Sequence, residues 1–408
     1  MVETVSGGVK DEPIALMAPP TPARPRWAVN KFLVPEVIFG VGALSEVGNA
    51  VRRTGGRRAL VVTDPGVMAA GWVEESMPWL RAVGLDVHLW HGVTPNPKDH
   101  EVEAGVQAYL ESGCDVLVAI GGGSCIDAAK GIAILSGNDG RILDYEGVDR
   151  VSRAIPPMVM VPSTGGSGAD VTQFCVITDT ARRVKCTIAG RGLVPDISVT
   201  DPTLLTTMSP ELSANTALDA LSHAIEAYVS KAANFLSDAY ALAAIRGIVA
   251  HLPASVAEPS NLHAREGIAK ASLQAGLAFG NALLGATHAI SHQIGGALDL
   301  PHGLLNAILL PHVMHFNAAA APEQYARVAQ ALGLEVDRIP PWEAADHAAC
   351  AVRRLADGLG IPRGLAQVGV KRSDLDLFAE TALRDVYITT NPRTVTRDDV
   401  KQICLAAL

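Results

Sequence analysis

The sequence has no excess of basic residues: Lys and Arg number 33 against 42 Asp and Glu, and the formal net charge is −9. Such a chain has no positive field to attract a phosphate backbone or an anionic membrane surface, so we expect neither nucleic acid nor a membrane as a partner. It also has no uninterrupted apolar run near the roughly 18 residues that a membrane-spanning helix needs. With 49% hydrophobic residues, the composition favours a soluble globular protein with a sizeable core.

Cysteine is also scarce, and the six cysteines include no C-x-x-C pair. This spacing favours reduced thiols in a cytoplasmic protein over a disulfide framework. Residues 1–30 contain several prolines and scattered acids, without the compact apolar segment of a secretory signal. We therefore expect residues 1–30 to form a flexible arm and the protein to be cytoplasmic.

Short apolar runs alternate with helical stretches in the first half of the chain. Continuous Val, Ile and Leu runs are typical of buried parallel strands, so residues 31–207 are predicted to form an α/β domain around a parallel sheet with helices on both faces. Residues 173–188 contain two β-rich runs joined by turn formers, which predicts a hairpin. The other predicted strands lie in the runs ALVVTD (59–64), LDVHLW (85–90), DVLVAI (115–120), PMVMVPST (157–164) and PDISVTDP (195–202).

The β-rich runs stop after Asp201 and Pro202. Long Ala- and Leu-rich segments with helical spacing follow to the end of the chain, so residues 208–408 are predicted to form an all-helical domain. A chain of 408 residues is long enough for two or three domains of roughly 150 residues each. No Gly/Ser linker separates the two halves, which indicates that they pack firmly around a cleft.

Histidine is frequent in the second half, and two predicted helices carry a metal-like pattern. Asp219 and His223 are spaced i to i+4, as are His288 and His292, and His302 follows in the turn LPHG. This spacing puts each pair on one helix face, so that they can reach a common ion. A carboxylate with several imidazoles suits Zn²⁺ or Fe²⁺ better than Ca²⁺ or Mg²⁺. For any one of these histidines taken alone, a structural role in the core explains the residue as well as metal binding does.

A glycine-rich turn, residues 121–124 (GGGS), directly follows a predicted strand and precedes a helix. Glycines let the backbone approach a pyrophosphate, and the helix N-terminus favours its charge. The turn is neither G-x-G-x-x-G nor a P-loop, and a tight strand-to-helix turn is the alternative.

Two further features could contact a nucleotide. Asp64, at the end of a predicted strand, could accept hydrogen bonds from an adenosine ribose and repel a 2′-phosphate, which favours NAD over NADP. The loop that contains Ser163, Thr164 and Ser167 could bind a phosphate or a carboxamide. Ordinary turns are an equal alternative at both places.

Three motifs together resemble the iron-containing, or group III, alcohol dehydrogenase family. They are GGGSCIDAAK (121–130), ALDALSHAIEAYVS (217–230) and HAISHQIGGALDLPHGLLNAILLPHV (288–313), and the resemblance runs from about Lys31 to Leu408. It implies an N-terminal dinucleotide-binding α/β domain and a C-terminal helical metal-binding domain, a dehydroquinate synthase-like fold. It also implies a homo-oligomer, either a dimer or a larger assembly.

The resemblance also implies roles for individual residues. Asp219, His223, His288 and His302 match the metal ligands, His292 matches a proton-relay residue near the nicotinamide, and Phe279 matches an aromatic residue on the substrate side. The family's cofactor contacts fall on Asp64, Asn96, Gly122, Gly123, Ser124, Asp127, Ser163, Thr164 and Lys185.

Two departures from the family pattern lie beside the cofactor. Cys125 replaces the proline that commonly follows GGGS, and Asp170 takes the place of a glutamate. Neither departure touches a metal ligand, but both could change how tightly the cofactor is held.

The expected activity is hydride transfer between a small primary alcohol and NAD, or less expectedly NADP, with Fe²⁺ or Zn²⁺ polarising the substrate oxygen. Reduction of an anionic aldehyde such as phosphonoacetaldehyde is one alternative, and a regulatory protein with little turnover is another. A lyase of the dehydroquinate-synthase type is disfavoured, because it needs cations to hold its anionic substrate and residues 281–322 contain no Arg or Lys.

Overall fold

The computed structural model describes residues 31–408, and residues 32–408 form one compact unit. The arm expected for residues 1–30 lies outside the described residues. All strands lie in the first half of the described chain, and the second half is helical, as predicted from the end of the β-rich runs. The last strand ends at Thr200, and the first helix of the second half begins at Pro210. Whether residues 31–207 and 208–408 behave as separate domains stays a prediction.

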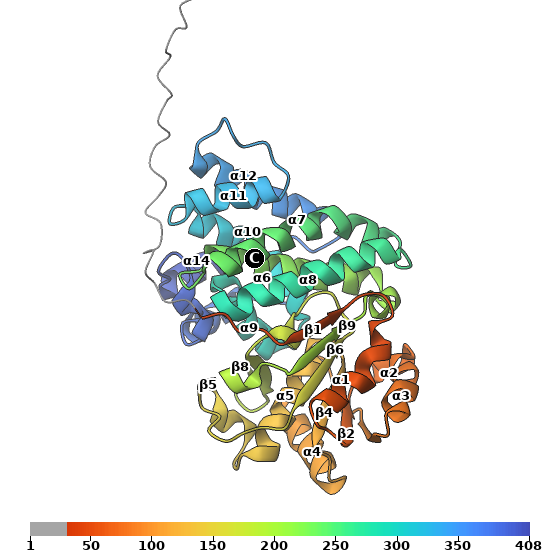
Figure 1. The fold of residues 1–408 in the computed structure, drawn as a ribbon. Helices are drawn as coiled ribbons and strands as arrows, with labels where there is room; N and C mark the ends of the chain where they lie inside the picture. The colour runs from red at the N-terminus through yellow and green to blue at the C-terminus, as the bar shows by residue number, and fades with distance from the viewer. Residues whose placement is uncertain (1–30) are drawn as a thin grey trace, which may run out of the picture. The chain divides into compact units, whose positions relative to one another are not determined.

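The main sheet of the described residues has six strands, and every pair in it is parallel. Figure 1 shows most of them in succession across the sheet. The predicted strands are confirmed. Strand β1, at the edge of the sheet, is an additional strand that the alternation of apolar runs and helical stretches did not predict. In spatial order the strands are β1 (Glu36–Phe39), β9 (Ile197–Thr200), β6 (Met158–Pro162), β4 (Val116–Gly121), β2 (Arg58–Val62) and β3 (Asp86–Trp90).

Helices cover both faces of this sheet because its central strands are apolar on both sides. Leu60 and Val62 of β2 belong to a core that includes Ile126 and Ile132, whereas Val61 packs into the core on the other face. The helices of this half are α1 (Val47–Arg53), α2 (Pro65–Ala69), α3 (Trp72–Ala82), α4 (Asp99–Glu111) and α5 (Gly123–Gly137).

A smaller sheet contains the predicted hairpin. Strands β7 (Phe174–Asp179) and β8 (Val184–Ala189) pair antiparallel, and β5 (Gly147–Val148) pairs parallel with β8. Helix α9 packs against β8, so this small sheet brings residues of the first half against the helical half.

The helical half begins with α6, which Ser209 caps by accepting a hydrogen bond from the Leu212 N–H at 3.1 Å. Helices α7 and α8 pack against α6 and against each other. Its helices are α6 (Pro210–Val229), α7 (Phe235–Ala257), α8 (Leu262–Ala282), α9 (Ala286–Leu298), α10 (His302–Ala318), α11 (Pro322–Ala331), α12 (Pro341–Gly358), α13 (Leu375–Ala382) and α14 (Arg397–Ala406).

Among the described residues one helix, α7, is long and apolar enough to cross a membrane, judged by length and composition alone. One face of α7 carries Ala241, Ile245 and Ile248, which are fully buried in the core. A core helix of a soluble protein passes the same test, so this helix is weak evidence for a membrane.

Candidate metal and nucleotide site

Three helices bring together the four residues that the sequence predicted as metal ligands. Asp219 and His223 come from α6, His288 from α9 and His302 from α10, and one ligand atom of each lies within 4.8 Å of the others. His302 was expected in a turn, but it is the first residue of α10, because Pro301 ends the preceding segment and the helix starts directly after it.

The ligand atoms face one another. The Nε2 atom of His223 lies 3.9 Å from Asp219 Oδ1, and the Nε2 atoms of His288 and His302 each lie 3.8 Å from it. Ligand atoms about 2.1 Å from a tetrahedral ion are about 3.4 Å apart, so the observed separations are close to those of an ion site. One carboxylate and three imidazoles are also a donor set that Zn²⁺ and Fe²⁺ accept. The four residues therefore fit a divalent transition metal.

Close packing of α10 on α6 makes this convergence possible. A Cβ on Gly303 would lie 2.3 Å from the Asn215 carbonyl oxygen and 3.2 Å from Asp219 Cβ. No larger residue fits there without moving backbone, so the glycine after His302 lets the start of α10 reach Asp219.

Asn306 contacts three of the four ligands, and the sequence reasoning missed it. Its Nδ2 lies 2.7 Å from Asp219 Oδ1, 3.0 Å from His288 Nε2 and 3.1 Å from His302 Nε2. Its Oδ1 is buried and has no hydrogen-bond partner among the described residues. The amide therefore holds the Asp219 carboxylate and lies at the centre of the site.

Glu226, also missed from the sequence, orients His288. Its carboxylate lies 2.6 Å from His288 Nδ1, and it accepts hydrogen bonds from the Thr287 N–H at 2.7 Å and the Gly285 N–H at 3.2 Å. Because Glu226 is on Nδ1, the Nε2 atom of His288 points to Asp219. A carboxylate behind a ligating histidine is a common feature of metal sites.

The two carboxylates of the site stay ionised although they are buried. Burial acts to raise the pKa of Asp219, but the neighbouring His223 and His302 hold that pKa well below its usual value. Burial likewise acts to raise the pKa of Glu226, and the hydrogen bond with His288 outweighs it, so the pKa is lowered. An ionised carboxylate is the form that binds a metal.

His292, one turn after His288, lies beside the four ligands and is paired with another residue that sequence reasoning missed. Asp385 Oδ2 lies 2.8 Å from its Nδ1, and both side chains are buried. Burial lowers the pKa of His292 and outweighs the opposing effect of Asp385. The imidazole is thus held neutral in one orientation, with Nε2 as the nitrogen that accepts a proton.

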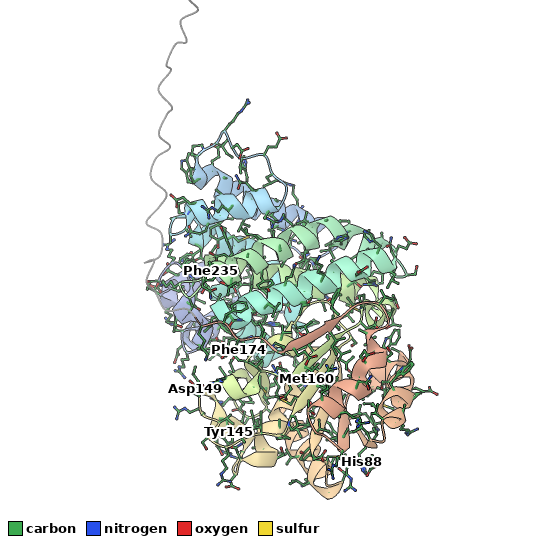
Figure 2. The ribbon with its side chains drawn as sticks, in the orientation of Figure 1. His88, Tyr145, Asp149, Met160, Phe174 and Phe235 are labelled. Carbon is green, nitrogen blue, oxygen red and sulfur yellow. The ribbon has the colours of Figure 1, made fainter. Side chains whose placement is uncertain are left out.

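Aromatic rings form a wall beside the ligands. Phe279 stacks on His223 with centroids 4.3 Å apart, and its role on the substrate side stays a prediction. Phe174, labelled in Figure 2, stacks on Phe279 at 6.1 Å and meets Tyr387 edge-on at 5.6 Å. Tyr387 in turn lies 5.7 Å from the His292 ring. No sequence pattern points to Phe174 or Tyr387, because the wall forms only when elements that are distant in the chain meet.

The predicted phosphate cradle lies between β4 and α5. Gly122 precedes α5, and no side chain caps the backbone N–H groups of its first turn, which is the arrangement that the predicted phosphate cradle requires. A Cβ on Gly122 would lie 3.2 Å from Thr164 Cγ2, and one on Gly123 would lie 2.8 Å from Ser167 Cβ. The glycines therefore also allow the predicted hydroxyl-rich loop to lie against the cradle.

Lys130, the last residue of the motif GGGSCIDAAK, holds the end of that loop. Its fully buried Nζ donates to the carbonyl oxygens of Ala169, Thr172 and Phe174 at 2.6 to 2.8 Å. Asp170, the second departure from the family pattern, is buried and accepts a hydrogen bond from Ser198 Oγ at 2.7 Å. Both residues thus have structural roles around the nucleotide side of the site.

Asp127 and Lys185 are close enough on this side to influence each other's pKa. Burial raises the pKa of Asp127 to about 7, against the opposing effect of Lys130. Burial lowers the pKa of Lys185 to about 8, against the attraction of Asp219 and Asp127. A Cβ on Gly295 would lie 3.3 Å from Lys185 Cε, so the lysine runs directly beneath α9. Lys185 therefore connects the nucleotide side with the metal side.

Asn96 joins the two halves of the chain. Its backbone N–H donates to Ser124 Oγ at 3.2 Å, and its side-chain Nδ2 donates to Asp299 Oδ1 at 2.8 Å. Helix α10 carries two further histidines, His312 and His315, that are not part of the metal cluster. They line a hollow of about 310 Å³ between α10 and α12.

Known proteins are similar to this chain over nearly its whole length. Residues 35–202 match the iron-containing alcohol dehydrogenase family, and residues 213–408 match the C-terminal part of the Fe-containing alcohol dehydrogenase family. A 1,3-propanediol dehydrogenase from Citrobacter freundii is 43% identical over 91% of this chain and 97% of its own length. An NAD-dependent methanol dehydrogenase from Bacillus methanolicus is 41% identical over 93% of this chain and 100% of its own length.

Solved structures agree with the sequence matches. The crystal structure of a 1,3-propanediol oxidoreductase, 41% identical, superposes with a TM-score of 0.91 over 93% of this chain and 100% of that one. Both the family resemblance and the fold expected from the sequence are thereby confirmed. The chain belongs to the iron-containing alcohol dehydrogenase family.

Proposed function

We propose that this protein catalyses reversible hydride transfer between a small primary alcohol and NAD at a divalent metal held by Asp219, His223, His288 and His302. The observation that carries the proposal is the convergence of these four side chains, buried or nearly so, with their ligand atoms within 4.8 Å. The metal, iron or zinc, supplies a Lewis acid for the substrate oxygen, and the nicotinamide supplies the hydride acceptor.

The chain's own residues bind and orient the reactants. The turn at Gly122 and Gly123 with Ser124, and the loop with Ser163 and Thr164, suit a pyrophosphate. Lys185 lies against Gly295 of α9, the helix that carries His288. Asp64 at the end of β2 suits the adenosine ribose, which favours NAD over NADP. Asn96 lies over Ser124 at 3.2 Å and closes this side.

His292 is the group we assign to proton transfer. Its Nδ1 is held by Asp385 at 2.8 Å, so Nε2 takes the proton that leaves the alcohol hydroxyl and returns it when an aldehyde is reduced. The rings of Phe279, Phe174 and Tyr387 form an apolar wall that would exclude water from the substrate side.

We also propose that the protein is a cytoplasmic homo-oligomer. All six cysteines are free, which suits a reducing compartment. Large apolar side chains are exposed on the surface, such as Phe235 on α7 with 70% of its area accessible, and burial against a second copy would remove them from water.

The test is NADH oxidation by the purified protein with short aldehydes and phosphonoacetaldehyde, after chelation and after adding back Fe²⁺ or Zn²⁺. We expect turnover of propanal that chelation abolishes and metal restores. Preference for phosphonoacetaldehyde would identify a reductase of anionic aldehydes instead. If no aldehyde turns over although metal and NADH bind, the activity is wrong and a regulatory role replaces it.

A further inference from the structure

The carboxylate of Asp64 is held at both oxygens. Oδ1 accepts a hydrogen bond from the Val67 N–H at 2.9 Å, which caps α2, and Oδ2 accepts one from the Cys125 thiol at 3.1 Å. Cys125 belongs to the first turn of α5, directly after the glycine-rich turn. Side chains from two neighbouring strand-to-helix turns thus meet at this carboxylate.

Packing around Cys125 fixes the direction of its sulfur. The side chain is fully buried, and a Cβ on Gly121 would lie 2.4 Å from Cys125 Sγ. The thiol therefore fills the space over Gly121 and extends toward Asp64. Burial and the nearby Asp64 raise the pKa of Cys125, so the thiol stays protonated and remains a donor. The proline common at this position in the family has no such donor.

We propose that Cys125 is a positioning residue that fixes the Asp64 carboxylate for the adenosine ribose and thereby increases the preference for NAD over NADP. The inference rests on the proposed function, in which Asp64 contacts the ribose. A carboxylate with both oxygens hydrogen-bonded keeps one rotamer, and its remaining lone pairs accept ribose hydroxyls without a further ordering cost. A 2′-phosphate then meets a negative charge that cannot turn away.

The test compares the dissociation constants of NADH and NADPH, measured by fluorescence titration without aldehyde. The variants are Cys125→Ala, Cys125→Val, Cys125→Ser and Asp64→Ala. Cys404→Ala is the matched control, because Cys404 is also a fully buried thiol but lies in α14. The valine variant removes the donor while filling the space, so a folded variant without a thiol is available if alanine destabilises the protein.

Loss of the thiol should weaken NADH binding about threefold to tenfold and leave NADPH binding within about twofold, so that the preference falls. Serine, which keeps a donor, should preserve the preference, and so should the control. An equal loss for both nucleotides would overturn the proposal and leave Cys125 a packing role.

The Asp64→Ala variant distinguishes a failure of the inference about Cys125 from a failure of the proposed contact between Asp64 and the ribose. If this variant loses the preference and the Cys125 variants keep it, the inference about Cys125 fails while the proposed function stands. If Asp64→Ala keeps the preference, the ribose contact itself is wrong.

Discussion

Glu226 shows how much of this site depends on residues that would never touch the metal. It contacts His288 at 2.6 Å and the backbone at the start of α9, so it fixes both the ring and the helix that carries it. We expect Glu226→Gln to weaken metal binding about 10- to 100-fold, because the amide can no longer act as an ionised acceptor for Nδ1–H. Competition with a chromophoric chelator measures this affinity. Glu266→Gln, at an exposed position of α8, is the control, and equal affinities in the two variants would contradict the role of Glu226.

We expect Lys185 to make nucleotide binding depend on pH. Burial lowers its pKa to about 8, and a lysine is cationic below its pKa and neutral above it. Attraction between Lys185 and the nucleotide phosphates should therefore be present at pH 7 and fade as the pH rises through about 8. We expect the NADH affinity of the wild type to decline as the pH rises from 7 to above 8. The Lys185→Met variant should bind NADH weakly throughout this pH range. Affinity in the wild type that is independent of pH would contradict this charge assignment.

Hydrogen bonds between secondary-structure elements close the nucleotide side. Asn96 and Asp299 both have positive φ, 55° and 51°, and face each other from the loop before α4 and from the end of α9. Lys98 Nζ lies 3.5 Å from the other oxygen of Asp299. We expect Asp299→Ala to speed NADH dissociation about fivefold, since one hydrogen bond across the site is lost.

Stopped-flow displacement of NADH measures that rate. Asp299→Asn, which keeps an acceptor and tolerates positive φ, should retain slow release. If the alanine variant releases NADH at the wild-type rate, the contact does not control exchange.

The elements were more predictable than the contacts between them. Buried parallel strands such as β4 are continuous apolar runs, so they can be recognised from the local sequence without knowing which elements pack against them. The edge strand β1 was not predicted, because its four residues, EVIF, are partly exposed and follow Pro35 without a distinctive hydrophobic pattern. His302 was assigned to a turn because a proline and a glycine flank it, but Pro301 stands directly before the first residue of α10 and His302 begins that helix.

The candidate site was predictable only where its residues share an element or a motif. The i to i+4 pairs gave Asp219 with His223 and His288 with His292, but their partners are far away in the chain. Glu226 is 62 residues from His288, and Asp385 is 93 residues from His292. A lone Glu or Asp in a helical segment carries no signal of its own, so these contacts appear only in the folded chain.

At the scale of the whole molecule, the metal site joins three helices, α6, α9 and α10. An ion that binds only the folded chain stabilises it by about 2.7 kcal/mol at a concentration 100 times its dissociation constant. We therefore expect metal loading to raise the melting temperature by about 3 °C, since the entropy of unfolding grows with chain length. His288→Ala should show no such rise at the same metal concentration. An equal rise in both proteins would indicate metal binding at some other site.

The most direct test of the account is turnover by His288→Ala at saturating metal, NADH and aldehyde. His288 contributes one ligand atom of the four and no group of the nucleotide side. We predict that this variant oxidises no NADH, although it still binds the nucleotide with an affinity close to that of the wild type. Turnover at the wild-type rate would contradict the metal site, and with it the proposed chemistry.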